Sequence, residues 1–150
     1  MPLSFKPETI QLVLVQFRIR NPESKEKMPS EMNIQVLFEE DEKRLGVFLD
    51  FEMGDISSST PEKYPFDLKV VYFGSFSLRG DEFQEEEIIK LGAINCAAII
   101  FPFLREEVAN LTLKAMQRPV LLPPFNFLKF YKEKRDNIKL DLIKKQHSAS

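Results

Sequence analysis

Apolar residues recur at every second position along four segments in the first half of the chain. This period sends alternate side chains to opposite faces and predicts β-strands with one buried face. The charged stretch 40–43 between the second and third segments predicts the turn of an antiparallel hairpin. The four segments are residues 10–20, 32–39, 45–53 and 66–78.

The pattern changes after Gly80. The acidic stretch 81–91 favours a helix, Gly92 predicts a break, and a longer helix is predicted from Asn95 to Met116. Because proline lacks a backbone donor, the residue at position 102 predicts either the first turn of that helix or a kink in it. Apolar residues at alternating spacings of four and three mark one helical stripe: Ala97, Phe101, Leu104, Val108, Leu111 and Ala115.

A proline-rich extended loop is predicted from Arg118, and a basic helix is predicted to begin near Phe127. Four strands followed by helices indicate an α+β fold, a four-stranded antiparallel sheet with the C-terminal helices packed on one face. We expect residues 1–150 to form a single domain, with a frayed or disordered tail over residues 137–150.

The composition excludes several classes of site. The chain has 150 residues, 43% of them apolar, and this supplies a core without disulfides or a structural metal. The lone Cys96 forms no internal bridge, which is typical of a reducing compartment. The N-terminus has no apolar signal region, and the apolar stretch 93–104 is too short to cross a bilayer, so a cytoplasmic protein with no membrane insertion is expected.

Candidate catalytic groups are sparse. His147 is the fourth residue from the end of the chain, and Cys96 lies in an apolar run without a basic neighbour. Asp50 and Glu52 point the same way from one strand, ~6.6 Å apart along it, but a wet strand face explains them better than paired catalytic carboxylates. We therefore predict no enzyme, no metal site and no cofactor.

Charge is unevenly distributed although the formal total is only −2. Residues 127–150 hold seven Lys or Arg against three acids, which leaves the tail at +4 and the remainder at −6. Such a tail could contact phosphates, but a solvated helix face is the more common role, and no nucleic-acid partner is expected.

Large apolar residues stand in the proline-rich loop, where polar residues are usual. Two interpretations remain open from the residues alone. The loop is either a lid over the core of its own domain or one wall of a groove that takes apolar ligands or extended peptides.

Two separated motifs resemble the SecB family of export chaperones. The first is the run 96–106, in which a Cys precedes an apolar stretch, a Phe-Pro-Phe unit and an Arg-Glu pair. The second is the loop 119–127, which ends in Pro-Phe-Asn-Phe, and residues 74–80 resemble the end of the family's fourth strand. The resemblance covers roughly residues 9–135.

The resemblance implies an ATP-independent holdase that keeps unfolded preproteins competent for export. It also implies a homotetramer built as a dimer of dimers. The expected client-binding residues are Leu121, Leu122, Phe125 and Phe127, with Phe17 and Val15 of the first strand.

One part of the surface departs from the family. SecB proteins that deliver clients to the SecA motor use acidic residues on the exposed sheet face, whereas the matching positions here are Gln16, Arg20 and Lys69. Because like charges oppose docking, delivery to SecA is in question. The alternative is a SecB-like chaperone of a toxin–antitoxin system that protects an antitoxin.

Overall fold

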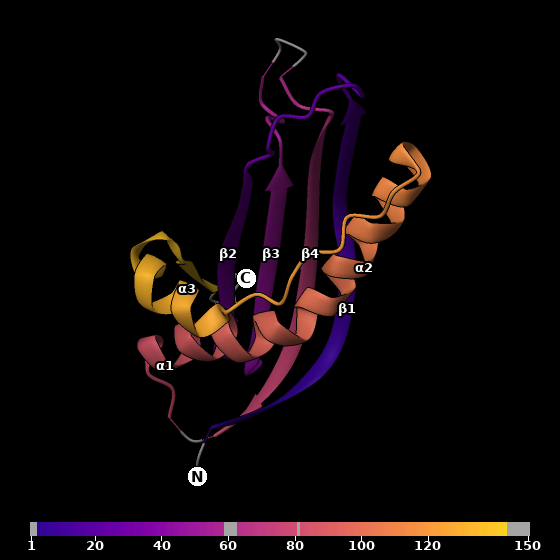
Figure 1. Cartoon of the computed structure of the whole chain (residues 1–150). Coiled ribbons are helices and arrows are strands. Elements are labelled where there is room, and N and C mark those ends of the chain that lie inside the picture. The colour runs from indigo at the N-terminus through magenta and orange to yellow at the C-terminus, as the bar shows by residue number, and fades with distance from the viewer. Residues whose placement is uncertain (1–2, 59–62, 81, 144–150) are drawn as a thin grey trace, which may run out of the picture.

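The computed structural model describes residues 3–58, 63–80 and 82–143. A five-stranded sheet carries all of the helices of the described residues on one face (Figure 1). The strand order is β1-β4-β3-β2-β5. The elements are β1 (Ser4–Ile19), β2 (Ser30–Glu39), β3 (Arg44–Met53), β4 (Phe66–Arg79), α1 (Glu85–Lys90), a π-helix (Leu91–Cys96), α2 (Ala97–Met116), α3 (Phe127–Lys134), a 3-10 turn (Arg135–Asn137) and β5 (Lys139–Ile143).

The predicted hairpin and fourth strand are confirmed. β2 and β3 pair antiparallel from Glu39 with Arg44 at the turn to Ser30 with Met53 at the far end. The inward side chains of β2, β3 and β4 are buried against the helices and alternate with outward side chains that remain partly exposed. The core therefore lies between the sheet and the helix layer, as a half-buried antiparallel sheet requires.

β1 departs from the simple alternation predicted for it. Its pairing with β4 shifts between Pro7 and Thr9 and again between Leu12 and Leu14. Val13 is the additional residue of the second β-bulge. Even-numbered Ile10 and Leu12 face the helices between the two bulges, and odd-numbered residues do so after Val13. Val13 is consequently 52% exposed and does not share a buried face with Val15.

The sheet has five strands instead of the four predicted, and it is mixed instead of wholly antiparallel. β5 runs parallel to β2, with Gln35 beside Lys139 and Glu39 beside Ile143. A frayed tail was expected to begin at residue 137, and over 137–143 this expectation is wrong. β5 forms because the free edge of β2 offers unpaired backbone groups. The short pattern of residues 139–143 does not by itself indicate a strand, since strand formation depends on that partner. Residues 144–150 of the expected tail, including His147, lie outside the described residues.

The helical layer is longer and more continuous than predicted. α1, the π-helix and α2 follow one another without interruption, so the predicted break at Gly92 is wrong. A Cβ at Gly92 would come within 3.0 Å of Val36, so the glycine allows close approach to the sheet. Pro102 lies inside α2 and has no N–H to donate to the carbonyl of Ala98, four residues earlier. Because Ala98 is exposed, the proline is tolerated there.

The continuous helix Glu85–Met116 is long and apolar enough to cross a membrane by length and composition alone. Half of its most apolar window is buried within the domain. Its inward residues, among them Ile100 and Leu104, are fully buried in the core. The same features are those of a core helix packed on a sheet.

Candidate functional site

The proline-rich loop is fixed to α2 by a buried hydroxyl. α2 ends at Met116 and is capped by Gln117, whose left-handed backbone (φ 61°) turns the chain back. Thr112 is fully buried, its hydroxyl donates to the Val108 carbonyl at 2.8 Å, and it accepts from the Val120 N–H at 2.7 Å. The Thr112 hydroxyl thus satisfies the backbone N–H of Val120, which has no partner in the sheet. From there the loop returns along α2 toward α3 (Figure 1).

The loop ends in a cluster of four phenylalanine rings. Phe125 lies 4.7 Å from Phe127, 6.2 Å from Phe101 and 5.7 Å from Phe130, measured between ring centroids. Asn126 caps α3 by accepting a hydrogen bond from the Lys129 N–H at 3.0 Å. The cap confirms the predicted start of α3 at Phe127 and holds the rings in a defined geometry.

The predicted loop residues divide between the core and the surface. Leu122 and Phe127 are buried, at 8% and 5% exposure, and pack in the core of this chain. Phe125 is half-buried, whereas Leu121 is 67% exposed. The loop therefore serves as a lid through one set of side chains and presents apolar surface through another.

Further large apolar side chains are exposed on the neighbouring helices. We use the name loop–helix surface for Leu121 of the loop, Phe103 and Leu113 of α2, and Leu128 of α3. Phe103 also contacts Tyr72 of β4, with ring centroids 6.5 Å apart. Burying these side chains against a partner would be favourable by roughly 25 cal/mol per Å² of apolar area removed from water.

The two predicted residues of β1 lie elsewhere, on the edge strand of the sheet. Val15 and Phe17 are half-buried on the helix-covered face, and Phe17 stacks on Phe66 at 5.3 Å between ring centroids. They are far from α3, because β1 forms one edge of the sheet and α3 lies near the opposite edge, beside β2 (Figure 1).

The outer face of the sheet carries two of the three residues for which the sequence resemblance predicts a place on a SecA-docking face. Gln16 and Lys69 are cross-strand neighbours in the pairing of β1 with β4. The Lys69 ammonium lies 3.5 Å from Asp50 Oδ2 and 3.3 Å from Glu52 Oε1. This part of the face is a mixed network of charges, and its lysine is already neutralised.

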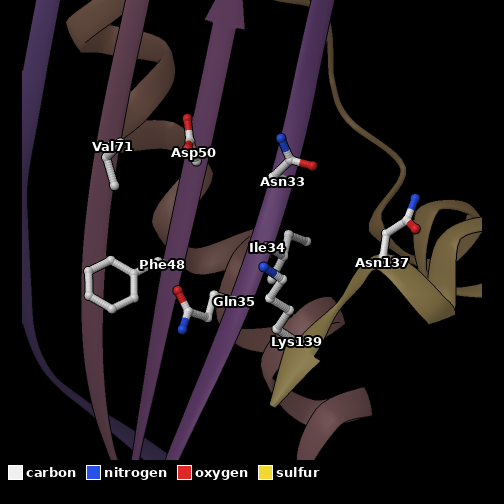
Figure 2. A pocket seen from close by; sticks show the side chains of 8 residues that line it. All are labelled: Asn33, Ile34, Gln35, Phe48, Asp50, Val71, Asn137 and Lys139. Carbon is white, nitrogen blue, oxygen red and sulfur yellow. The ribbon is translucent and has the colours of Figure 1, made fainter. Parts of the chain in front are cut away.

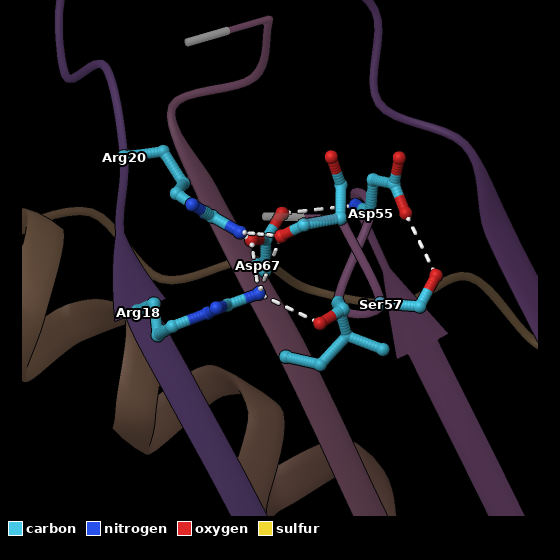
Figure 3. A network of polar contacts seen from close by, with 7 residues as sticks. Arg18, Arg20, Asp55, Ser57 and Asp67 are labelled. Carbon is cyan, nitrogen blue, oxygen red and sulfur yellow. Dashed lines mark hydrogen bonds and ion pairs between the residues drawn. The ribbon is translucent and has the colours of Figure 1, made fainter. Parts of the chain in front are cut away.

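Arg20 belongs to a different network at the end of the sheet (Figure 3). It is 11% exposed and forms an ion pair with Asp67, which is 2% exposed and also lies 3.2 Å from Arg18. Asp67 further accepts the Asp55 N–H at 2.9 Å. Arg20 also donates to the Ser58 carbonyl, so it anchors the loop after β3 and is not an open docking charge.

The ionisable groups of the outer face are tuned by burial and by one another. Burial raises the pKa of Asp50 above its ordinary value despite the opposing effect of Lys69. Although burial acts to lower it, the carboxylates of Asp50 and Glu52 hold the pKa of Lys69 above its ordinary value. Burial raises the pKa of the Cys96 thiol to about 12, so this cysteine stays a protonated core residue at neutral pH.

Metal-binding groups do not gather in the parts of the chain that the structure describes. No cluster of three or more His, Cys, Asp or Glu side chains is found there. Asp50 and Glu52 share Lys69 between them, as expected for a wet strand face.

Some residues that build this region were not identified from the sequence. Thr112 carries no sequence signal for its contact with Val120, because the partner is a backbone group eight residues away. Phe130 falls in the predicted basic helix, and only the packing of α3 brings it to Phe125.

Comparison with known proteins agrees with this architecture. Residues 15–137 match the family described as "Preprotein translocase subunit SecB". The chain belongs to the SecB family. Two relatives are both named "Protein-export protein SecB". The relative from Anaplasma phagocytophilum is 38% identical over a match that covers 50% of this chain and 49% of the relative. The relative from Rickettsia felis is 30% identical over a match that covers 69% of this chain and 64% of the relative. The chain thus spans between about half and two thirds of these relatives.

Solved structures share the fold at low sequence identity. A SecB-like chaperone of Mycobacterium tuberculosis, in complex with a ChAD peptide from the HigA1 antitoxin, superposes with a TM-score of 0.62. It is 16% identical, over 81% of this chain and 90% of that one. A protein of unknown function from Streptococcus agalactiae gives a TM-score of 0.52 at 15% identity, over 83% of this chain and all of the other.

Proposed function

We propose that this SecB-family protein is an ATP-independent holdase of the cytoplasm. It binds unfolded preproteins through apolar surface and keeps them competent for translocation, with no cofactor. The observation that carries the proposal is the loop–helix surface, built on a loop that Thr112 and the phenylalanine cluster hold in place. Family membership supports a chaperone over an enzyme.

The chemistry of the surface suits clients of many sequences. Apolar contact has no directional requirement, so Leu121 and its neighbours discriminate little between client segments. Several modest contacts along one unfolded chain multiply through effective concentration. A rigid support lowers the ordering cost of each contact, since the phenylalanine cluster already fixes the loop.

Suppression of aggregation tests the holdase activity. A chemically unfolded model protein is diluted into buffer with and without a stoichiometric amount of the chaperone, and light scattering is recorded. We expect scattering to fall sharply. Unchanged scattering would remove the holdase proposal.

Paired variants test the site. Leu121→Asp combined with Phe125→Ser should weaken client binding by at least tenfold, measured by fluorescence anisotropy of a labelled unfolded peptide. Leu142→Asp is the matched control, because Leu142 is also exposed, at 49%, but lies on β5. Equal affinity of both variants would remove the loop from the site. Leu122 and Phe127 are part of the proposed site but also hold the core, so they make poor test positions. Phe17 and Val15 form a second, separate client contact on β1 in this proposal.

We propose further that the protein assembles as a homotetramer, a dimer of dimers. β1 is an edge strand of the sheet, and Leu12, Val13 and Ile19 are exposed on it at 44%, 52% and 53%. Such an edge is a template for pairing with another chain. Native mass spectrometry should give a tetramer, and Val13→Lys should shift the population to smaller species.

A second candidate is protection of an antitoxin in place of delivery to SecA. It is favoured by the neutralised charges around Lys69 and by the fold shared with the chaperone that binds an antitoxin peptide. Titration with SecA separates the two candidates. Binding at micromolar concentration or tighter supports export delivery, and absence of binding supports the antitoxin role.

A further inference from the structure

A hollow of about 310 Å³ opens on the outer face of the sheet, away from the loop–helix surface (Figure 2). Its lining comes from β2, β3 and β4 and from the C-terminal segment that forms the 3-10 turn and β5. Phe48 and Val71 provide apolar area, and Asn137 and Lys139 form one side. A concave site with an apolar base and a few convergent polar groups is the usual form of a small-molecule site.

Opposite charges line this hollow without being paired to each other. Asp50 uses Oδ2 for Lys69, and its Oδ1 is buried without a hydrogen-bond partner among the described residues. Lys139 is exposed and forms no ion pair within the part of the chain that the structure describes. The Asp50 side chain is 27% exposed and lines the hollow, where its carboxylate has room for a second cationic donor beside Lys69. A cation and an anion on one ligand would therefore each find a partner.

The strand register gives the span of such a ligand. Asp50 pairs with Asn33 and Lys139 pairs with Gln35, so the two charged residues are two strands and two residues apart. Standard strand spacings place their Cα atoms about 12 Å apart. The side chains of Asp50 and Lys139 extend over part of this distance. A ligand whose two charges are several bonds apart spans the rest.

Amide side chains between the charges complement a peptide group. Asn33, Gln35 and Asn137 all line the hollow, and each amide carries both donors and an acceptor. Gln35 donates through Nε2 to Asp141, which holds the side chain and leaves its oxygen to accept. A peptide bond needs one donor and one acceptor, and these amides supply both.

We propose that this hollow binds a free dipeptide with an apolar side chain. Its ammonium group contacts Asp50, its carboxylate contacts Lys139, the peptide bond lies among the amides, and the apolar side chain packs on Phe48. The C-terminal segment is essential to the site, because it contributes Asn137 and Lys139. The site is separate from the loop–helix surface and stands or falls independently of holdase activity.

Titration with leucyl-phenylalanine, followed by NMR of the backbone amides, tests the proposal. We expect saturable shifts at Phe48, Asp50 and Lys139. The same dipeptide with an acetylated N-terminus and an amidated C-terminus should bind at least tenfold more weakly. Equal binding of the capped form would overturn recognition of the two charges, and shifts confined to other residues would overturn the site.

Variants decide the roles of the two charged residues. Asp50→Asn and Lys139→Gln should each weaken leucyl-phenylalanine binding by about tenfold or more, and Lys129→Gln on α3 is the matched control. Lys69 keeps Glu52 at 3.3 Å in the first variant, so its charge stays paired. If Asp50→Asn fails to fold, the Lys139→Gln variant still tests the proposal, because Lys139 is exposed. Wild-type affinity in the Lys139→Gln variant would overturn the proposal.

Discussion

The two faces of the sheet are built by different physics. The inner face buries Val36, Leu49 and Val70 completely against the helices, and its stability comes from close-packed apolar area. The outer face leaves Phe48 and Phe73 half-exposed, with ring centroids 4.7 Å apart, among charged and amide side chains. The inner face therefore fixes the fold, whereas the outer face has freedom to carry recognition.

Matched leucine deletions should separate the faces most strongly. Leu49→Ala on the inner face should lower the free energy of unfolding by about 2–5 kcal/mol. Leu37→Ala on the half-buried outer face should lower it by about 1 kcal/mol, because less area is removed from water. Urea denaturation measures both. Equal losses would mean that another molecule covers the outer face in solution.

The charged groups offer a second contrast, between a buried carboxylate and a partly exposed one. Asp67→Ala should lower the free energy of unfolding by about 3 kcal/mol, because it leaves the nearly buried Arg20 without its partner. Glu52→Ala should cost at most about 1 kcal/mol, since the pair with Lys69 is solvated. A small effect of Asp67→Ala would show that Arg20 finds other partners. Urea denaturation at low and high salt checks the pair.

The smallest expected effect is a pH-dependent contact within the helical layer. Exposed Glu86 of α1 accepts from Arg135 at 2.8 Å and from Tyr131 of α3, and hydrogen bonds from Arg135 and then Tyr131 lower its pKa from 4.5 to about 2. A lowered folded-state pKa contributes stability that is present above pH 4.5 and lost as the pH falls through about 2.

NMR of the Tyr131 ring measures this contact. Its signal should be constant from neutral pH to about 4.5 and should change as the pH approaches 2. Glu86→Gln is the control and should remove the acid transition in this signal. A transition retained in that variant would assign it to other carboxylates.

Most of the sheet could be predicted from period alone, because one face of each strand is buried. The β2–β3 hairpin, β4 and the start of α3 at Phe127 are confirmed. The phase change at Val13 was missed, since a bulge depends on how β1 meets β4 and leaves no mark in the order of apolar residues. The break predicted at Gly92 failed because glycine also serves close packing, here against Val36.

The candidate site followed the same division. The apolar residues of the proline-rich loop were visible in the sequence, and the resemblance to SecB added the prediction that they bind clients. The family assignment agrees with that resemblance. It did not separate Leu121, which is exposed, from Leu122, which is buried, because adjacent loop residues have no fixed period. Their roles depend on how Thr112 and the phenylalanine cluster orient the backbone.

By itself the sequence determined the α+β class, the four main strands and membership in the SecB family, because periodicity and local motifs are written in neighbouring residues. Only the tertiary structure decided the fifth strand, the neutralisation of Lys69 and the hollow beside Lys139. Each of these joins residues far apart in the chain. Their energies depend on partners that no short window of sequence contains.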